Sequence, residues 1–327
     1  MSATPARPYL QFDGITKRYV GVTALDRVSL DVPEYCVHAL MGENGAGKST
    51  LLKTLSGAHL PSAGQLLLDG HPHVFASTGA ALAAGVAVIY QELHLVPGMT
   101  VAENIFLGHL PQRGGVVNRP ALRRAAAALL HRLGEEDIDP DQPLARLPIG
   151  QRQMVEIAKA LSRGAKVIAF DEPTSSLSVR EIEKLFAVIR NLRAQGCAIL
   201  YVTHRMEEVF TLCDACTVLR DGRHVRTYET LTGVDPATLV QDMVGREIAD
   251  VYAYAPRPHG APALEIEGLT GPGLHAPISL NVAQGEIVGC FGLIGAGRTE
   301  WLKLLFGAAP RTGGVIRVHG EPVELSA

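Results

Sequence analysis

The chain has 327 residues, of which 47% are hydrophobic and only 5% aromatic, and its formal net charge is −3. This length suffices for two domains that each bury a core, and the near-neutral charge gives no basic footprint, so we expect no nucleic-acid partner. No apolar run approaches the roughly 18 residues of a membrane-spanning helix, and residues 1–8 lack the apolar core of a signal peptide. We therefore expect any membrane role to pass through a partner protein.

A glycine-rich loop follows the first strongly apolar strand. Alternating apolar and polar positions predict short strands over residues 9–38, and an apolar strand over 37–41 runs directly into the pattern G-x4-G-K-S at residues 42–49. A helix is predicted over 50–55, and strand, loop and helix in this order are the context in which the pattern binds phosphate rather than forming an ordinary glycine-rich turn.

The chemistry of this loop predicts ATP and Mg²⁺ as ligands. Backbone N–H groups and the helix N-terminus would bind the phosphates, Lys48 would reach the β- and γ-phosphates, and the Ser49 hydroxyl would ligate Mg²⁺. The predicted nucleotide-binding residues of the loop are Gly42, Glu43, Asn44, Gly45, Ala46, Gly47, Lys48, Ser49 and Thr50.

The middle of the chain alternates helical and strand patterns. Apolar residues at 3- and 4-residue spacing predict helices over 121–133 and 151–162, within a helical insert at about 95–160. Short apolar runs at 167–170 and 198–202 predict buried parallel strands. This alternation predicts an α/β fold with a parallel core sheet, an antiparallel β subdomain and the helical insert.

Two adjacent carboxylates, Asp171 and Glu172, follow the apolar strand at 167–170. Ligands gather at the carboxyl ends of strands in open parallel sheets. Asp171 is suited to bind Mg²⁺ through water, and Glu172 to orient or deprotonate an attacking water. A solvated strand end is the alternative, since structural carboxylates also cluster at such positions.

Two further polar residues follow apolar runs. His204 follows residues 200–203 and is expected within reach of a γ-phosphate, although a capping or core histidine is the alternative. Gln91 follows residues 88–90 and could contact both Mg²⁺ and the attacking water at the entrance to the helical insert. The predicted catalytic residues are therefore Glu172, His204 and Gln91, and the predicted metal ligands are Ser49, Gln91 and Asp171.

The sequence repeats itself with a constant offset of 250 residues. Ser29-Leu30 returns as Ser279-Leu280, and Gly45-Ala46-Gly47 returns as Gly295-Ala296-Gly297. We interpret the chain as a first nucleotide-binding domain over 1–250, a Pro/Gly-rich linker over 251–263, and the start of a second, similar domain over 264–327.

These motifs, in this order, resemble the ATP-binding subunits of ABC transporters. By this resemblance, residues 42–49 are the Walker A loop, residues 167–172 the Walker B strand, and Gln91 and His204 the Q- and H-loop residues. Tyr19 takes the place of the aromatic residue that stacks on adenine, with an ordinary strand aromatic as the alternative. The family's signature loop corresponds to Leu147, Pro148, Ile149, Gly150 and Gln151.

The second glycine-rich loop, residues 292–298, narrows the resemblance to monosaccharide importers. The stretches at 38–43, 90–97, 114–119, 169–178 and 244–248 are most similar to L-arabinose importers, with galactose, ribose and xylose as alternatives. The resemblance implies an ATPase on the cytoplasmic face of the bacterial inner membrane. It would act on two permease subunits through a groove near Gln91. Through these permeases it would cooperate with a periplasmic sugar-binding protein.

Three other functions stay open at this point. A soluble ABC protein acting on ribosomes or DNA is disfavoured by the charge. A P-loop kinase would leave the signature loop without a role. A non-hydrolysing remnant is the third alternative.

Two residues depart from the family pattern. Arg298 stands in place of the second loop's lysine, and Pro148 in place of the signature serine. In the family, the Walker A loop of one domain faces the signature loop of another, so these two departures would fall in one weakened composite site. We expect Pro148→Ser with Arg298→Lys to raise ATPase activity more than either change alone.

Ser178 replaces an aspartate that many relatives carry. The working site needs a signature loop from a second half or a second copy, so the chain alone is expected to bind ATP and to hydrolyse it feebly.

Overall fold

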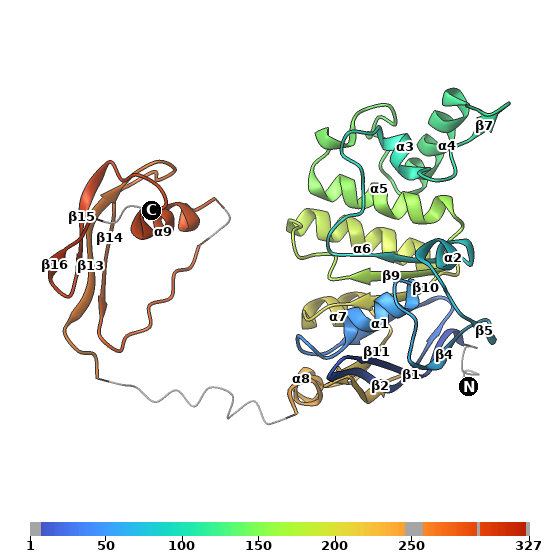
Figure 1. Cartoon of the computed structure of the whole chain (residues 1–327), viewed down its shortest axis with the longest axis horizontal. Helices are drawn as coiled ribbons and strands as arrows, with labels where there is room; N and C mark the ends of the chain where they lie inside the picture. The colour runs from blue at the N-terminus through green and yellow to red at the C-terminus, as the bar shows by residue number, and fades with distance from the viewer. Residues whose placement is uncertain (1–7, 246–257, 293–294, 325–327) are drawn as a thin grey trace. The chain divides into compact units, whose positions relative to one another are not determined.

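The computed structural model describes residues 8–245, 258–292 and 295–324. The chain divides into two compact units, Met1–Val251 and Tyr252–Ala327, which we describe separately (Figure 1). Within the described residues, no helix is both long enough and apolar enough to span a bilayer.

A six-stranded sheet with the order β12-β11-β3-β10-β9-β6 forms the centre of the first unit. Its strands are β3 (Cys36–Met41), β6 (Val86–Ile89), β9 (Val167–Asp171), β10 (Ala198–Val202), β11 (Ala215–Arg220) and β12 (Arg223–Tyr228). All neighbours pair in parallel except β12, which is antiparallel to β11. β3 and β10 are buried along their whole length, which explains why the sequence shows them as continuous apolar runs.

Successive residues of the central strands bury opposite faces of this sheet. Ile168 and Phe170 pack in one core with α4 (Arg119–Arg132), α5 (Ile149–Ser162) and α6 (Val179–Ala194). Val167 and Ala169 pack in a second core with α1 (Lys48–Leu55) and the antiparallel sheet. A third core holds α7 (Met206–Leu212) and α8 (Pro236–Val244) against β3 and β11.

The antiparallel sheet of the first unit has the order β2-β1-β4-β5. It comprises β1 (Pro8–Tyr19), β2 (Val22–Pro33), β4 (Ala63–Leu68) and β5 (His71–His73), and α2 (Thr78–Ala83) follows it. The strands predicted over 9–38 are confirmed, but their predicted short length is wrong, because β1 and β2 each have 12 residues. Gly14 resembles a turn signal in the sequence, but it has a φ of 60° within an irregularity of one continuous strand.

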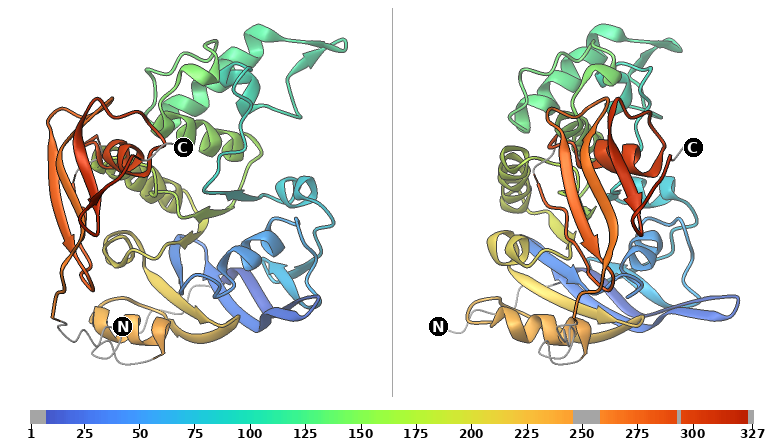
Figure 2. Two further views of the ribbon diagram at one scale, coloured as in Figure 1. Left: turned by 60° about the vertical axis from the view of Figure 1, so that its left-hand side comes forward. Right: turned by 90° about the vertical axis from the view of Figure 1, so that its left-hand side faces the viewer.

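The helical insert lies at one end of the first unit and contains more than helices (Figures 1 and 2). α4 and α5 confirm the predicted helices at 121–133 and 151–162, and α3 (Val101–Ile105) begins with a capping box between Thr100 and Glu103. A hairpin of β7 (Gln112–Arg113) and β8 (Val116–Val117) and a 3₁₀ turn (Leu144–Arg146) also belong to the insert, and the sequence did not predict them.

The second unit repeats the antiparallel sheet with the same register. Its sheet has the order β14-β13-β15-β16, and one helix lies in the chain between β14 and β15, as α1 lies between β2 and β4 of the first unit. In the first unit Phe12 pairs with Leu30 and Leu66, and in the second Ile266 pairs with Leu280 and Ile316. The elements are β13 (Pro262–Thr270), β14 (Ile278–Ala283), α9 (Arg298–Phe306), β15 (Gly313–Val318) and β16 (Glu321–Pro322).

Two predictions concern the start and the loop of this unit. Residues 251–257 of the predicted linker lie outside the described residues, and β13 begins at Pro262, before the predicted domain start at 264. Residues 293–294 of the second glycine-rich loop also lie outside them. Residues 286–291, which correspond to β3, form no strand, since no described residues of this unit provide neighbours like β10 and β11.

Candidate active site

The predicted site residues come together at one edge of the parallel sheet. In the register of the sheet, Val202 pairs with Leu40 and Asp171, and Ile89 pairs with Phe170. The carboxyl ends of β3, β10, β9 and β6 therefore meet at this edge, where ligands bind in open parallel sheets. The segments that leave these ends carry the glycine-rich loop, His204, Glu172 and Gln91.

Close backbone approaches explain the glycines at both ends of the loop. A Cβ on Gly42 would lie 2.3 Å from the carbonyl oxygen of Leu219, and one on Gly47 would lie 2.9 Å from that of Ala24. Gly47 has a φ of 100° and is the N-cap of α1, without a side chain to cap the helix. The first N–H groups of α1 thus remain available to an anion.

Lys48 is only 6% exposed and turns back onto its own loop. Its Nζ donates hydrogen bonds to the carbonyl oxygens of Gly42 (2.7 Å) and Glu43 (3.0 Å). Burial lowers the pKa of Lys48, and the nearby carboxylates of Glu172 and Asp171 oppose that shift. The lysine is therefore an ordered cation close to the two acidic residues, and its contact with phosphates stays a prediction.

Glu172 and His204 form a pair across the ends of β9 and β10. His204 Nδ1 lies 3.2 Å from Glu172 Oε1. Glu172 has a φ of 46°, which is uncommon for a residue with a side chain, and its N–H donates to the carbonyl oxygen of Val202 at 3.0 Å. Such strain clusters at functional sites, and this pair has the composition of a general base and its orienting partner.

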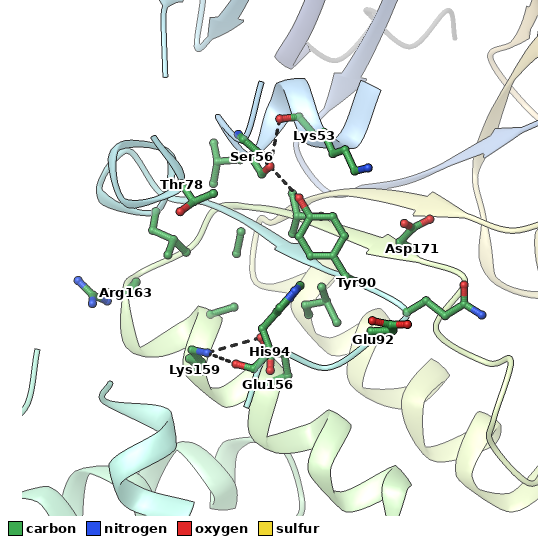
Figure 3. Close-up of a pocket in the computed structure, with 18 of the residues that line it drawn as sticks. Lys53, Ser56, Thr78, Tyr90, Glu92, His94, Glu156, Lys159, Arg163 and Asp171 are labelled. Atoms are coloured by element: carbon green, nitrogen blue, oxygen red, sulfur yellow. Dashed lines mark hydrogen bonds and ion pairs between the residues drawn. The ribbon is translucent and has the colours of Figure 1, made fainter. Parts of the chain in front are cut away.

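Asp171, Ser49 and Gln91, the three predicted metal ligands, line one cavity of about 750 Å³. Figure 3 shows Asp171 on one side of this cavity, with Lys53 and Tyr90 nearby. Burial and the negative charge of Glu172 raise the pKa of Asp171, while Lys48 and Lys53 oppose this effect. A carboxylate in such surroundings is stabilised by a cation.

These groups fit a magnesium nucleotide and not an all-protein metal centre. Within the described part of the chain, no cluster of three His, Cys, Asp or Glu side chains could hold a metal ion. One carboxylate, one hydroxyl and one amide, all of them oxygen ligands, match Mg²⁺, which usually keeps several waters and binds phosphate oxygens. The uncapped helix end and the buried lysine supply the complementary site for phosphate.

The predicted signature loop lies at the start of α5, and none of its residues lines the cavity. Leu147 and Gly150 are buried, whereas Pro148 and Ile149 are exposed. Pro148 is the N-cap of α5 and makes no side-chain hydrogen bond to it. The role of this loop stays a prediction.

Tyr19 also lies outside the cavity lining. Tyr19 is 43% exposed, and its ring meets the ring of His59 edge to face, with centroids 6.0 Å apart. His59 does line the cavity. Tyr19 is thus an accessible aromatic surface beside the cavity, which leaves its role in adenine stacking a prediction.

Sequence reasoning missed three residues that organise this edge. Gln153 of α5 donates to the carbonyl oxygen of Pro173, directly after Glu172. Glu181 bonds to the backbone and hydroxyl of Ser178, and Glu208 accepts bonds from residues around His204. The capping-box spacing S-x-x-E from 178 to 181 was the one local signal for any of them.

The fold and this edge define a P-loop ATP-binding cassette. Residues 25–175 match the family model for ABC transporters, and the chain belongs to this family. The chain is 58% identical over 324 residues to the arabinose import ATP-binding protein AraG of Pectobacterium atrosepticum, covering 99% of this chain and 64% of the relative. The chain therefore spans slightly less than two thirds of the length of this relative.

Solved structures show the same fold. A nucleotide-free ATP-binding cassette from an ABC transporter matches with a TM-score of 0.63 and 22% identity, covering 76% of this chain and 100% of the other. The dimeric structure of a post-hydrolysis state of a cassette bound to ADP and Pi matches with a TM-score of 0.59 and 26% identity, covering 69% of this chain and 100% of the other. The predicted ABC-type α/β fold is confirmed.

Proposed function

We propose that this chain is the ATP-binding and ATP-hydrolysing subunit of an ABC importer for a monosaccharide, L-arabinose. The observation that carries the ATPase is the convergence of the Lys48 loop, Asp171 and the Glu172–His204 pair at one sheet edge. The sugar rests on the name of a relative that is 58% identical over 99% of this chain. Galactose, ribose and xylose are the alternatives.

Each residue of the edge has a role in this proposal. Lys48 and the first N–H groups of α1 bind the β- and γ-phosphates of ATP. Ser49, Asp171 and Gln91 would hold Mg²⁺, and the bound ion would supply neutralisation of the phosphate charge. Glu172 accepts a proton from the attacking water, and His204 keeps the Glu172 carboxylate in place beside the γ-phosphate.

Catalysis also needs a second cassette in this proposal. None of the signature-loop residues lines the cavity of Ser49, Gln91 and Asp171, so the residues from 147 to 151 would complete the site of another cassette. A second copy, or a second half that begins with the domain at 264–327, would supply the missing loop. The dimeric relative bound to ADP and Pi supports this arrangement.

The partners follow from the importer function. Two permease subunits would contact the cavity that runs from Gln91 to Glu156 and Lys159 of α5, and a periplasmic sugar-binding protein would deliver the sugar to them. The subunit would then lie on the cytoplasmic face of the bacterial inner membrane, attached through the permeases. Closure of the cassette dimer on ATP provides the differential affinity that drives such a switch.

Two experiments test this proposal. The Lys48→Ala variant should lose MgATP binding by at least about tenfold in titration with a fluorescent ATP analogue, while Lys184→Ala, at a half-exposed lysine of α6, should bind normally. Equal binding by Lys48→Ala would refute the nucleotide site. Disruption of the gene should abolish uptake of labelled L-arabinose and spare ribose, xylose and galactose; the opposite pattern would refute the sugar.

A further inference from the structure

Glu208 of α7 is a buried carboxylate with an unusually complete set of donors. It is 5% exposed, and four side chains donate to its two oxygens. Thr174 Oγ1 (2.6 Å) and Arg205 Nη1 (3.1 Å) contact Oε1, and Tyr201 OH (2.9 Å) and Thr203 Oγ1 (2.8 Å) contact Oε2. Two carboxylate oxygens offer about four lone pairs, so this set saturates an ionised carboxylate.

The donors to Glu208 surround the Glu172–His204 pair in the chain. Thr203 and Arg205 are the residues on either side of His204, and Thr174 lies two residues after Glu172. Thr203 Oγ1 also accepts a hydrogen bond from the N–H of Arg205 at 3.1 Å. A single buried carboxylate thus fixes both loops from which the pair projects.

The pair itself has little other support. The His204 side chain is 60% exposed, and a single exposed polar contact of this kind contributes little stability by itself. Glu172 has a strained positive φ that persists only where the surroundings enforce it. Its separation of 3.2 Å from His204 therefore depends on how firmly the two loops are held.

We propose that Glu208 is the positioning residue that holds His204 against Glu172 for ATP hydrolysis. The catalytic consequence rests on the proposed function, whereas the structural one does not. A neutral imidazole that faces a carboxylate through Nδ1 has its proton on Nδ1. Release of the His204 loop would let the imidazole return to a mixture of the two tautomers.

Two substitutions at Glu208 separate positioning from folding. Glu208→Ala removes every bond of the carboxylate. Glu208→Gln keeps the shape: its amide oxygen can accept from Arg205, which only donates, and its NH₂ group can face Tyr201 and Thr203, whose hydroxyls can turn to accept. Glu135→Gln, at another buried carboxylate that pairs with Lys184 of α6, is the matched control.

NMR of the ¹⁵N-histidine-labelled 327-residue chain, above the pH at which imidazoles protonate, reports the tautomer of His204. We expect Nδ1–H in the unaltered chain and in Glu135→Gln, a shift toward Nε2–H in Glu208→Ala, and a smaller shift in Glu208→Gln. Unchanged His204 signals in a folded Glu208→Ala would overturn the proposal. If Glu208→Ala does not fold, unchanged His204 signals in Glu208→Gln would overturn the proposal instead.

Phosphate release at saturating MgATP tests the catalytic part. Glu208→Ala should lower kcat by about 100-fold while the KM for ATP changes less than twofold, and Glu208→Gln should fall between. A fall in kcat with unchanged His204 signals also overturns the proposal, because Glu208 would then act elsewhere. Failure of the unaltered chain to bind MgATP would refute only the proposed function, since the NMR measurement needs no nucleotide.

Discussion

The carboxylate of Glu181 lies so close to Gly150 that a Cβ on this glycine would come within 2.4 Å of Glu181 Oε1. Glu181 belongs to the first turn of α6, where its Oε2 also accepts bonds from the N–H (2.8 Å) and hydroxyl (2.7 Å) of Ser178. These bonds to Ser178 lower the pKa of Glu181, and the N–H of Gly150 adds to the effect. One carboxylate thus accepts hydrogen bonds at the N-termini of both α5 and α6. At α5 it replaces a side-chain cap, because the N-cap residue Pro148 makes no such hydrogen bond.

We expect the effect of Gly150→Ala on stability to depend on Glu181. Alone, the added methyl group displaces the carboxylate and should destabilise the fold by about 1 kcal/mol. In a Glu181→Ala background the same change should stabilise it by up to about 1 kcal/mol, because alanine has the higher helix propensity. Urea unfolding of the four proteins measures both values.

Gly79 provides the control for this cycle. It lies in α2, and a Cβ there would meet only Ser77 Oγ at 3.8 Å, so Gly79→Ala should have the same effect in both backgrounds. A Gly150→Ala effect that is equal in both backgrounds would show that the carboxylate does not occupy this helix end in solution.

Glu172→Gln should separate nucleotide binding from hydrolysis. The amide keeps the side-chain shape and cannot accept the proton of the attacking water, so turnover should fall at least about 100-fold, while MgATP still binds and traps the closed form. Phosphate release and nucleotide titration check this, with exposed Glu183→Gln of α6 as the control. Normal turnover by Glu172→Gln would remove the catalytic role assigned to this carboxylate.

Asp171→Asn should stabilise the nucleotide-free protein and weaken its response to Mg²⁺. Burial raises the pKa of Asp171 in the folded state, so the folded state binds the proton more tightly and stability declines as pH rises above the unfolded value of 3.8. Near neutral pH the variant should melt about 2 °C higher in EDTA, and this gain should vanish toward pH 4. A lower melting temperature at neutral pH would contradict the argument.

Buried His38 should make the fold sensitive to mild acid. Its Nε2 lies 2.8 Å from Thr217 Oγ1, and burial lowers its pKa from 6.5 to about 4. Protonation then favours the unfolded chain, so stability is complete above pH 6.5 and falls by about 1.4 kcal/mol per pH unit as the pH drops toward 4.

Urea unfolding of a His38→Gln variant isolates this contribution. Between pH 6.5 and 5 its stability should decline less steeply than that of the unaltered chain, and exposed His71→Gln should behave like the unaltered chain. Identical slopes for His38→Gln and the unaltered chain would exclude His38 as the source.

The sequence predicted those parts of the site that depend on strand ends. Lys48, Asp171, Glu172 and His204 each follow an apolar run, and parallel pairing brings the ends of such runs to one edge. The hydrophobic spacing of α4 and α5 likewise predicted both helices, because tertiary packing reinforces the same face.

Contacts between distant segments were beyond such reasoning. Glu208 and Thr174 are 34 residues apart in the chain, and Glu181 meets Gly150 from a different helix. No local spacing encodes these pairs, since they arise only when separate helices pack on the sheet. The length of β1 was missed for a related reason: a bulge at Gly14 imitates a turn until the partner strands are placed.

The two intraloop bonds of Lys48 bear on the thermodynamics of ligand capture. An ammonium group has three hydrogens, and the carbonyl oxygens of Gly42 and Glu43 use two of them. The third remains free for an incoming oxyanion, and a side chain that is already immobilised gives up little of its roughly 2 kcal/mol of rotamer entropy when the anion arrives. The free energy of anion binding at this loop would then not be reduced by the cost of ordering the lysine side chain.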